Sequence, residues 1–531
     1  MKKIAIVLLL MMSILLCACG NSVSTAPEAE KTPVAEVETP VDEIKDEKYY
    51  ENLAAAAEGG DVDAMYELGW AYIYGDDIGQ DINLGISYIE KAAKAGDDGA
   101  MVDLAFIYSE GEYAEKDFVI AIEWFQRAAN AGNDIAMYDL AVMYERGEGV
   151  EQNYSASFDW YQRAAELGNT NAMFNLAVMY EQGTGTEQNY AKALEYYQRA
   201  ADLGDGQAMR AIGLLYYYGT GVQQNYSAAA TWYNRAIAAG FTRAEVNLAY
   251  LYENGYGVEK DIHKAIELFE HSANAEEPYA MWCLGDIYEN NQAVQDYTKA
   301  KEWYLRAAEA GASYAYENVG DLYIYGKGFP VDVDTAKSYY EKEAEAGECN
   351  GLFRLGLMYE FGEEITGIAV PKDPAKAAEL YQRIADKGHD KGMYQLAFMY
   401  LNGVGVDKNT AAAMYMLQRA SDAGNTDAMY KLGLNYIVGE YIEKDFDKGI
   451  GLITRAAEEG NVDAMYAAAV GYALNNDNTK AFEWASVAAE KGSASAMHFL
   501  GDMYNQGRGV KKDKAKADEW YKKAAEAGYQ S

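Results

Sequence analysis

The chain has 531 residues and a formal net charge of −38, from 83 Asp and Glu against 45 Lys and Arg residues. This excess of negative charge argues against nucleic-acid binding and against adhesion to anionic lipid headgroups. It permits basic protein partners or loosely held divalent cations, although solubility is the simpler explanation. Single globular cores saturate at about 250–300 residues, so the length favours an array that grows without deepening its core.

Residues 1–18 have the pattern of a secretory signal peptide. Two lysines precede an apolar run at residues 4–16, which is short for a membrane span. The run leads into Leu-Cys-Ala-Cys at 16–19, which resembles a bacterial lipobox, although Cys17 is a less usual residue at its position. The resemblance implies cleavage before Cys19 and a lipid on its sulfur. An uncleaved anchor helix is the alternative. In either case we expect the chain to be held at the extracytoplasmic face of a bacterial membrane.

Residues 19–48 are expected to form a disordered, acidic tether. They contain three prolines and eight acidic residues, and they have no aromatic residue. Such a segment buries too little apolar surface to offset the entropy cost of ordering the chain. A helix predicted at about 44–59, which ends in an alanine-rich stretch, would be an unpaired half-repeat that caps the array which follows.

Residues 49–531 are dominated by an internal repeat of about 36 residues. A small residue, most often Ala followed by Met, recurs with Tyr eight positions later, and we number each repeat from this residue as position 0. The thirteen residues at position 0 are Ala64, Ala100, Ala136, Ala172, Ala208, Ala244, Ala280, Ala315, Gly351, Gly392, Ala428, Ala464 and Ala496. The repeats are expected to begin near residues 61, 97, 133, 169, 205, 241, 277, 312, 348, 389, 425, 461 and 493. A fixed period of this size predicts a solenoid in which each repeat covers its neighbour's apolar face.

Each repeat has the pattern of two antiparallel helices. Positions 0, +1, +4, +5 and +8 lie on one arc of a helix, Asp or Asn at −3 is a typical N-cap, and Gly at +11 marks the C-terminal end. An Asp or Asn then opens a second helix in all thirteen repeats. No strand pattern appears in the repeats. The predicted fold is all-α, an α/α superhelical solenoid of about thirteen two-helix repeats.

The last repeat carries the pattern most completely, at Ala496, Leu500, Gly501, Tyr504, Gly507, Gly509, Val510, Asp513, Ala517, Trp520, Tyr521, Ala524, Ala525 and Gly528. This pattern resembles the Sel-one-like repeat family, a relative of the tetratricopeptide repeats, over about residues 50–529. The resemblance implies a right-handed α-superhelix that acts as a protein-interaction scaffold, usually without catalysis. Secreted members with a cysteine pair in each repeat differ from this chain, so their stabilisation by disulfides is not implied here.

The sequence offers little for chemistry. Cys283 and Cys349 lie two repeats apart, which places them beyond disulfide distance. The four histidines are scattered, and no metal-ligand, nucleophile or phosphate-loop motif is present. We therefore expect no catalytic residue, metal site or cofactor, and we do not expect an enzyme.

A binding surface is better supported. Positions +2 and +6 lie outside the packed arc, and in the tetratricopeptide relatives the matching positions line the concave surface. The aromatic residues at these positions are Tyr66, Trp70, Phe106, Tyr138, Phe174, Tyr250, Trp282, Phe353, Tyr394, Phe398, Tyr430 and Tyr466. They could be buried against the preceding repeat's second helix, form a groove for an extended peptide or a partner helix, or stack on sugar rings.

The sequence thus predicts a membrane-tethered, extracytoplasmic scaffold that binds an unidentified protein or peptide through the concave surface of its repeats. A surface protein that binds cell-wall glycan is the alternative. No nucleic-acid partner is expected.

Overall fold

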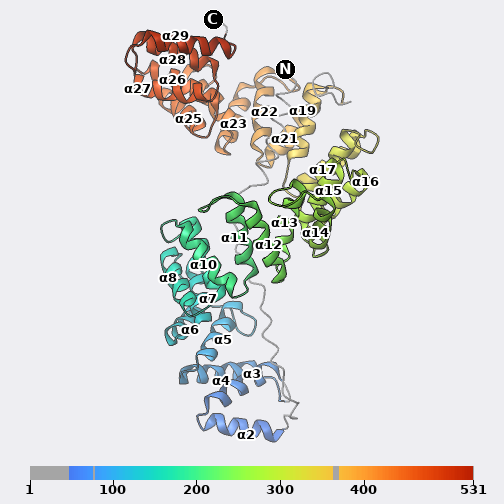
Figure 1. Cartoon of the computed structure of the whole chain (residues 1–531), viewed down its shortest axis with the longest axis vertical. Coiled ribbons are helices and arrows are strands. Elements are labelled where there is room, and N and C mark those ends of the chain that lie inside the picture. Colours follow the sequence, from blue (N-terminus) through green and yellow to red (C-terminus); the bar gives the residue numbers. More distant parts are fainter. Residues whose placement is uncertain (1–46, 76–77, 363–369, 530–531) are drawn as a thin grey trace. The chain divides into compact units, whose positions relative to one another are not determined.

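The computed structural model describes residues 47–75, 78–362 and 370–529 (Figure 1). Within these residues the chain forms 27 α-helices and no strand, which confirms the all-α solenoid of two-helix repeats. The chain divides into two compact parts, which we call the N-terminal body (residues 1–203) and the C-terminal body (residues 204–531). The predicted signal peptide, Cys19 and nearly all of the predicted tether lie outside the described residues.

In its described residues, the N-terminal body contains one additional helix and repeats 1–4. Helix α2 (Glu47–Glu58) precedes the first repeat and packs against its first helix. The first and second helices of the four repeats are α3 (Val62–Tyr74) and α4 (Ile82–Ala95), α5 (Asp98–Glu110) and α6 (Phe118–Ala131), α7 (Asp134–Arg146) and α8 (Tyr154–Glu166), and α9 (Thr170–Gln182) and α10 (Tyr190–Asp202).

The C-terminal body contains repeats 5–13. Their helix pairs are α11 (Gly206–Tyr218) and α12 (Tyr226–Ala238), α13 (Arg243–Asn254) and α14 (Ile262–Asn274), α15 (Pro278–Asn290) and α16 (Tyr297–Glu309), α17 (Ala315–Ile324) and α18 (Val333–Glu345), α19 (Asn350–Phe361) and α21 (Pro374–Asp386), α22 (Asp390–Asn402) and α23 (Thr410–Asp422), α24 (Thr426–Val438) and α25 (Phe446–Glu458), α26 (Val462–Leu474) and α27 (Asn478–Glu490), and α28 (Ala494–Gln506) and α29 (Lys514–Glu526).

Capping side chains fix where the helices begin. All thirteen second helices start behind an Asp or Asn whose side chain accepts a backbone N–H of the first turn, as predicted; Asn153 and Ala156 N are an example, at 3.0 Å. The first helices of repeats 1–5 and 10–13 have a side-chain cap as well, which is Asp or Asn except for His389 in repeat 10 and Ser493 in repeat 13. The first helices of repeats 6–9 start behind Thr242, Glu277, Tyr314 and Cys349, and none of these N-cap residues makes a side-chain cap hydrogen bond.

In every repeat, one backbone hydrogen bond joins the N-cap of the second helix to the first helix. The N–H of the residue that caps the second helix donates to the carbonyl of Tyr at +8, at 2.7–3.1 Å in all thirteen repeats. The bond is 2.7 Å from Asp373 to Tyr359 across the longest connection, and 2.9 Å from Asp477 to Tyr472 across the shortest. The paired helices therefore keep the same start and end points, although the loops between them differ in length.

Small residues allow the helices to approach each other within a repeat. A β-carbon on Gly213, at position +5, would lie 2.4 Å from the ring of Tyr233 in the second helix, and Gly320 has the same relation to Tyr340 at 2.3 Å. The tyrosine rings themselves are completely buried. The Gly at +5 thus provides the space into which a large second-helix ring packs.

Candidate binding surface on the first helices

The first-helix face is the surface formed by positions +2, +3, +6 and +10 of successive first helices. Of the twelve aromatic residues predicted for it, Tyr250 and Phe398 are exposed, at 39% and 50%. The other ten are half-buried: Tyr66, Trp70, Phe106, Tyr138, Phe174, Trp282, Phe353, Tyr394, Tyr430 and Tyr466. The face is therefore partly accessible in both bodies, and its role in binding stays a prediction.

Three of the half-buried rings at +2, those of Tyr138, Phe174 and Phe353, rest on an aromatic ring from the second helix of their own repeat. Ring centroids are 5.7 Å apart for Tyr138 and Tyr161 and 5.5 Å apart for Phe174 and Tyr197. Such pairs stabilise the packing beyond the area they bury. This support comes from the repeat's own second helix, whereas one interpretation of the sequence placed the rings against the second helix of the preceding repeat.

Position +3 also belongs to this face, although the sequence pattern did not predict it. Tyr66 Oη and Trp70 Nε1 of repeat 1 both donate to Asp103 Oδ2, at +3 of repeat 2, at 2.6 and 2.9 Å. In the C-terminal body, Trp282 Nε1 donates to Asn318 Oδ1 at 2.9 Å with the same register. Side chains at +2 and +6 thus reach +3 of the next repeat, and the recurrence of polar residues just outside the packed arc was the signal that could have revealed this.

A group of aromatic rings, several of them exposed, lies in repeats 5–8. We call Tyr217, Tyr226, Tyr250, Tyr256, Tyr279, Trp282 and Tyr314 the aromatic patch. Tyr250 contacts Tyr217 and Tyr256, each at 6.2 Å between ring centroids, and Trp282 contacts Tyr279 at 5.8 Å. Four of these tyrosines are exposed. Only Tyr250 and Trp282 were predicted, because the other rings come from loops and helix ends outside positions +2 and +6.

Repeats 8 and 9 carry a network of ionisable groups. Arg354 bridges Glu317, at 2.5 Å, and Asp321, and Tyr340 Oη donates to Asp321 Oδ1 at 2.8 Å. Glu343 is completely buried and its Oε2 accepts the backbone N–H of Gly351 at 2.9 Å. Burial, together with the nearby Glu317 carboxylate, raises the pKa of Glu343 to about 8. These contacts use the carboxylates to hold helices together.

Among the described residues, the two cysteines of the repeats and the acidic residues show no arrangement typical of reactive chemistry. Cys283 and Cys349 are buried, and burial raises the pKa of both thiols, so they remain protonated near neutral pH. Across residues 47–75, 78–362 and 370–529, no group of three or more His, Cys, Asp or Glu residues is placed to hold a metal ion. In the same ranges no helix combines the length and hydropathy needed to cross a membrane.

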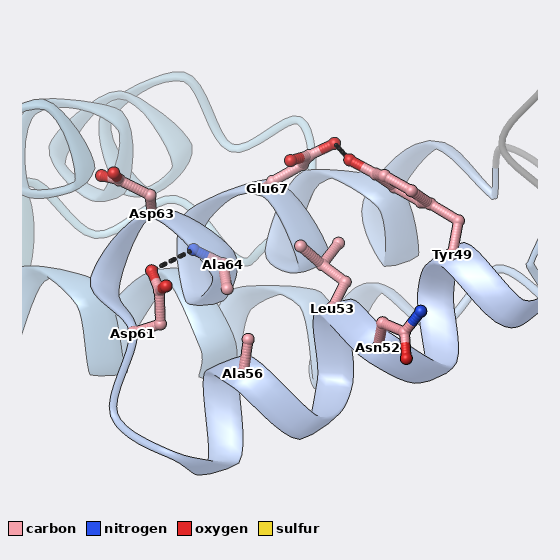
Figure 2. Close-up of a pocket in the computed structure, with 8 residues that line it drawn as sticks. All are labelled: Tyr49, Asn52, Leu53, Ala56, Asp61, Asp63, Ala64 and Glu67. Carbon is pink, nitrogen blue, oxygen red and sulfur yellow. Dashed lines mark hydrogen bonds between the residues drawn. The ribbon is translucent and has the colours of Figure 1, made fainter. Parts of the chain in front are cut away.

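A shallow hollow of about 360 Å³ lies between α2 and α3 (Figure 2). Two acidic side chains that line the hollow make hydrogen bonds within the protein. Asp61 Oδ1 accepts the N–H of Ala64 at 3.1 Å, and Glu67 Oε1 accepts the hydroxyl of Tyr49 at 2.5 Å. The hollow thus lies where α2 packs against the first helix of the first repeat.

A series of paired helices with an accessible face on the first helices defines the class of α-helical repeat proteins. The Sel1 repeat family matches residues 62–97, 99–133, 134–169, 170–205, 206–241, 242–276, 278–311, 313–348, 350–389, 390–425, 426–461, 462–493 and 494–529. The chain belongs to the Sel1 repeat family, which confirms the resemblance seen in the sequence. Its helical solenoid is a general protein–protein interaction fold, and proteins of the family typically bind other proteins and are generally non-catalytic.

A solved structure agrees with this assignment. The chain is similar to c5321, a protective antigen present in uropathogenic Escherichia coli strains that displays an SLR fold, with 27% identity over 91% of this chain and 98% of that chain, and a TM-score of 0.52. It is also similar to a Sel1 repeat protein from Oxalobacter formigenes, with 28% identity over 58% of this chain and 90% of that chain, and a TM-score of 0.48. A comparison with curated proteins finds no match.

Proposed function

We propose that the protein is a membrane-anchored, extracytoplasmic scaffold that recruits another protein through its first-helix face and the aromatic patch that adjoins this face. The observation that carries the proposal is the aromatic patch of repeats 5–8, in which Tyr250 and three further tyrosines remain exposed. Tyr and Trp rings supply large contact areas at a small cost in conformational entropy, and they dominate the energetics of many protein interfaces. An exposed cluster of them on a Sel1 repeat array is suited to partner capture.

The location is proposed from the N-terminal sequence. A signal peptide at residues 1–18 and a lipid on Cys19 would hold the protein at the membrane, and residues 19–48 would tether the repeats to it. A position outside the cytoplasm agrees with the description of the similar protein c5321 as a protective antigen. Replacing Cys19 by Ala should release the protein from the membrane fraction and abolish incorporation of a labelled fatty acid.

We propose a binding role without catalysis. The family is generally non-catalytic, and the most deeply buried acidic groups of this chain are engaged in structural contacts. Glu289, for example, accepts the hydroxyl of Tyr304 at 2.8 Å and pairs with Lys327 at 2.6 Å. Carboxylates held in this way stabilise the packing of neighbouring repeats.

Proximity labelling from the intact lipidated protein tests the function. The double variant Tyr250→Ala/Tyr279→Ala should lose the labelled partner while its thermal unfolding stays close to that of the wild type. The matched control is Tyr415→Ala, which removes a 60% exposed ring from a second helix and should leave the labelling pattern unchanged. Equal labelling by all three proteins would contradict partner recruitment through the patch. Retention of the wild-type protein, but not of the double variant, on isolated cell-wall glycan would favour the alternative ligand.

A further inference from the structure

A comparison of equivalent positions in neighbouring first helices identifies one acidic residue, Asp139, that has no hydrogen-bond donor among the described residues. In repeat 2, Asp103 at +3 accepts hydrogen bonds from Tyr66 at +2 and Trp70 at +6 of the preceding repeat. These two donors come from within the chain and satisfy the carboxylate. The same position one repeat further on is Asp139, which also carries a carboxylate on the first-helix face.

The residues that correspond to the two donors cannot serve Asp139. Val102 occupies the position of Tyr66, and Phe106 occupies the position of Trp70, so neither offers an N–H or O–H group. In the part of the chain that the structure describes, Asp139 has no hydrogen bond or ion pair. A half-buried carboxylate in this state loses hydration and gains no compensating partner.

The surroundings of Asp139 favour a cation. The Glu110 carboxylate lies nearby, and burial together with this like charge raises the pKa of Asp139 to about 7. The first helices of repeats 1–4 contain nine acidic residues and one basic residue, whereas their second helices contain six of each. That single basic residue, Arg146, is paired with Glu148 at 3.9 Å. Negative potential is thus concentrated on the first helices.

We propose that an arginine side chain of the recruited protein binds Asp139 and Glu110 beside Phe106, on the first-helix face of repeats 2 and 3. The proposal rests on the proposed function, because it assigns a side chain of the partner to this face. A guanidinium group is preferred to an ammonium group because its planar fork can donate to two carboxylates, because it sheds water more readily, and because it packs on aromatic rings. The guanidinium group would donate hydrogen bonds to Asp139, as the side chains of Tyr66 and Trp70 do to Asp103.

A random peptide library displayed on phage and selected against the full-length wild-type protein provides the probe. We expect enriched peptides to share an arginine, and replacement of this arginine by Gln to weaken binding to the wild type by at least about tenfold. The same replacement should have little effect on binding to Asp139→Asn, because the two changes remove the same contact. Asp103→Asn is the matched control, and it should retain the wild-type sensitivity to the arginine.

A second variant tests the register directly. Phe106→Trp places an indole N–H where Trp70 has one, so this N–H should occupy Asp139 and lower the affinity for the arginine peptides. Circular dichroism establishes that each variant folds. Enriched peptides whose arginine replacement costs as much affinity on Asp139→Asn as on the wild type would overturn this proposal while leaving partner recruitment intact. A library that yields no enriched peptide would overturn the proposed function as well.

Discussion

Gly392 and Ile384 lie so close together that a β-carbon on Gly392 would be 2.5 Å from Cγ1 of Ile384. Gly392 is at position 0 of repeat 10, and Ile384 lies in the preceding second helix, at a position that is Ala or Ser before every other repeat except repeat 9. Gly351 has the same relation to the side chain of Glu343, at 2.7 Å. The two repeats that have Gly in place of Ala at position 0 are thus the two that follow an enlarged second-helix residue.

This relationship predicts that Gly392→Ala destabilises the C-terminal body by about 1–3 kcal/mol, because the added methyl group overpacks a filled site. The double variant Gly392→Ala/Ile384→Ala should recover much of the loss, since it restores two small residues face to face. Urea unfolding followed by circular dichroism measures both effects. Additive losses in the double variant would contradict the explanation.

Two buried tyrosines form a matched pair for hydrogen bonding. Tyr197 Oη donates to Glu181 Oε2 at 2.8 Å, whereas the buried hydroxyl of Tyr233 has no partner among the described residues. Tyr197→Phe should therefore cost about 1–3 kcal/mol, because it leaves a carboxylate without its donor. Tyr233→Phe should be neutral or stabilising. Thermal unfolding of the two variants measures both effects, and an equal loss of stability in the two variants would contradict the prediction.

The cap of repeat 4 makes two contacts. Asn169 Oδ1 accepts the N–H of Ala172 at 2.9 Å, and its Nδ2 donates to Asp134 Oδ2 of repeat 3 at 3.0 Å. Asn169→Asp keeps the cap but places two carboxylates together, so we expect a loss of about 1 kcal/mol in unfolding free energy. Adding Asp134→Asn should restore stability by returning a donor to the pair. The absence of such rescue in chemical denaturation would contradict the role of this contact between repeats.

The pKa of Glu343 predicts a pH dependence of stability. Its value in the folded protein is about 8, above the ordinary 4.5 of a glutamate, so the folded state binds this proton more tightly than the unfolded state. The stability contributed by the group is complete below about pH 4.5 and is lost as the pH rises through about 8. Glu343→Gln keeps an acceptor for the N–H of Gly351 and carries no charge. Its melting temperature should therefore exceed that of the wild type at pH 9, and an unchanged difference between pH 5 and pH 9 would contradict this.

A further prediction concerns the face of repeat 10. Phe398→Ala and Tyr394→Ala should weaken capture of the partner by about tenfold or more if these rings act as interface anchors, with little change in stability because Phe398 is 50% exposed. Tyr415→Ala on the second helix of the same repeat serves as the control. Pull-down with the partner identified by proximity labelling measures the effect. Substantial unfolding of the Phe398 variant would instead assign this ring to the core.

Features that depend on a single repeat were predictable from the sequence. The Asp or Asn that begins each second helix and the small residues of the packed arc act over a few residues of chain, so thirteen copies revealed them clearly. Features that depend on neighbouring repeats were not. The acceptor at Asp103, the missing donor at Asp139 and the aromatic patch arise from side chains about one repeat apart, whose contacts follow from the spacing and rotation between helices. Signal cleavage and lipid attachment at Cys19 stay predictions.

The hydrogen bond from each second-helix cap to the carbonyl of Tyr at +8 has an evolutionary consequence. Because this bond holds the two ends of the loop together, a change in loop length does not alter the register of the two helices that the loop connects. Repeat 9 exceeds the common period by five residues, and its Asp373–Tyr359 bond is as short as any other of the series. Insertions in these loops can therefore change the surface of the protein without disturbing the helix packing that stabilises the fold.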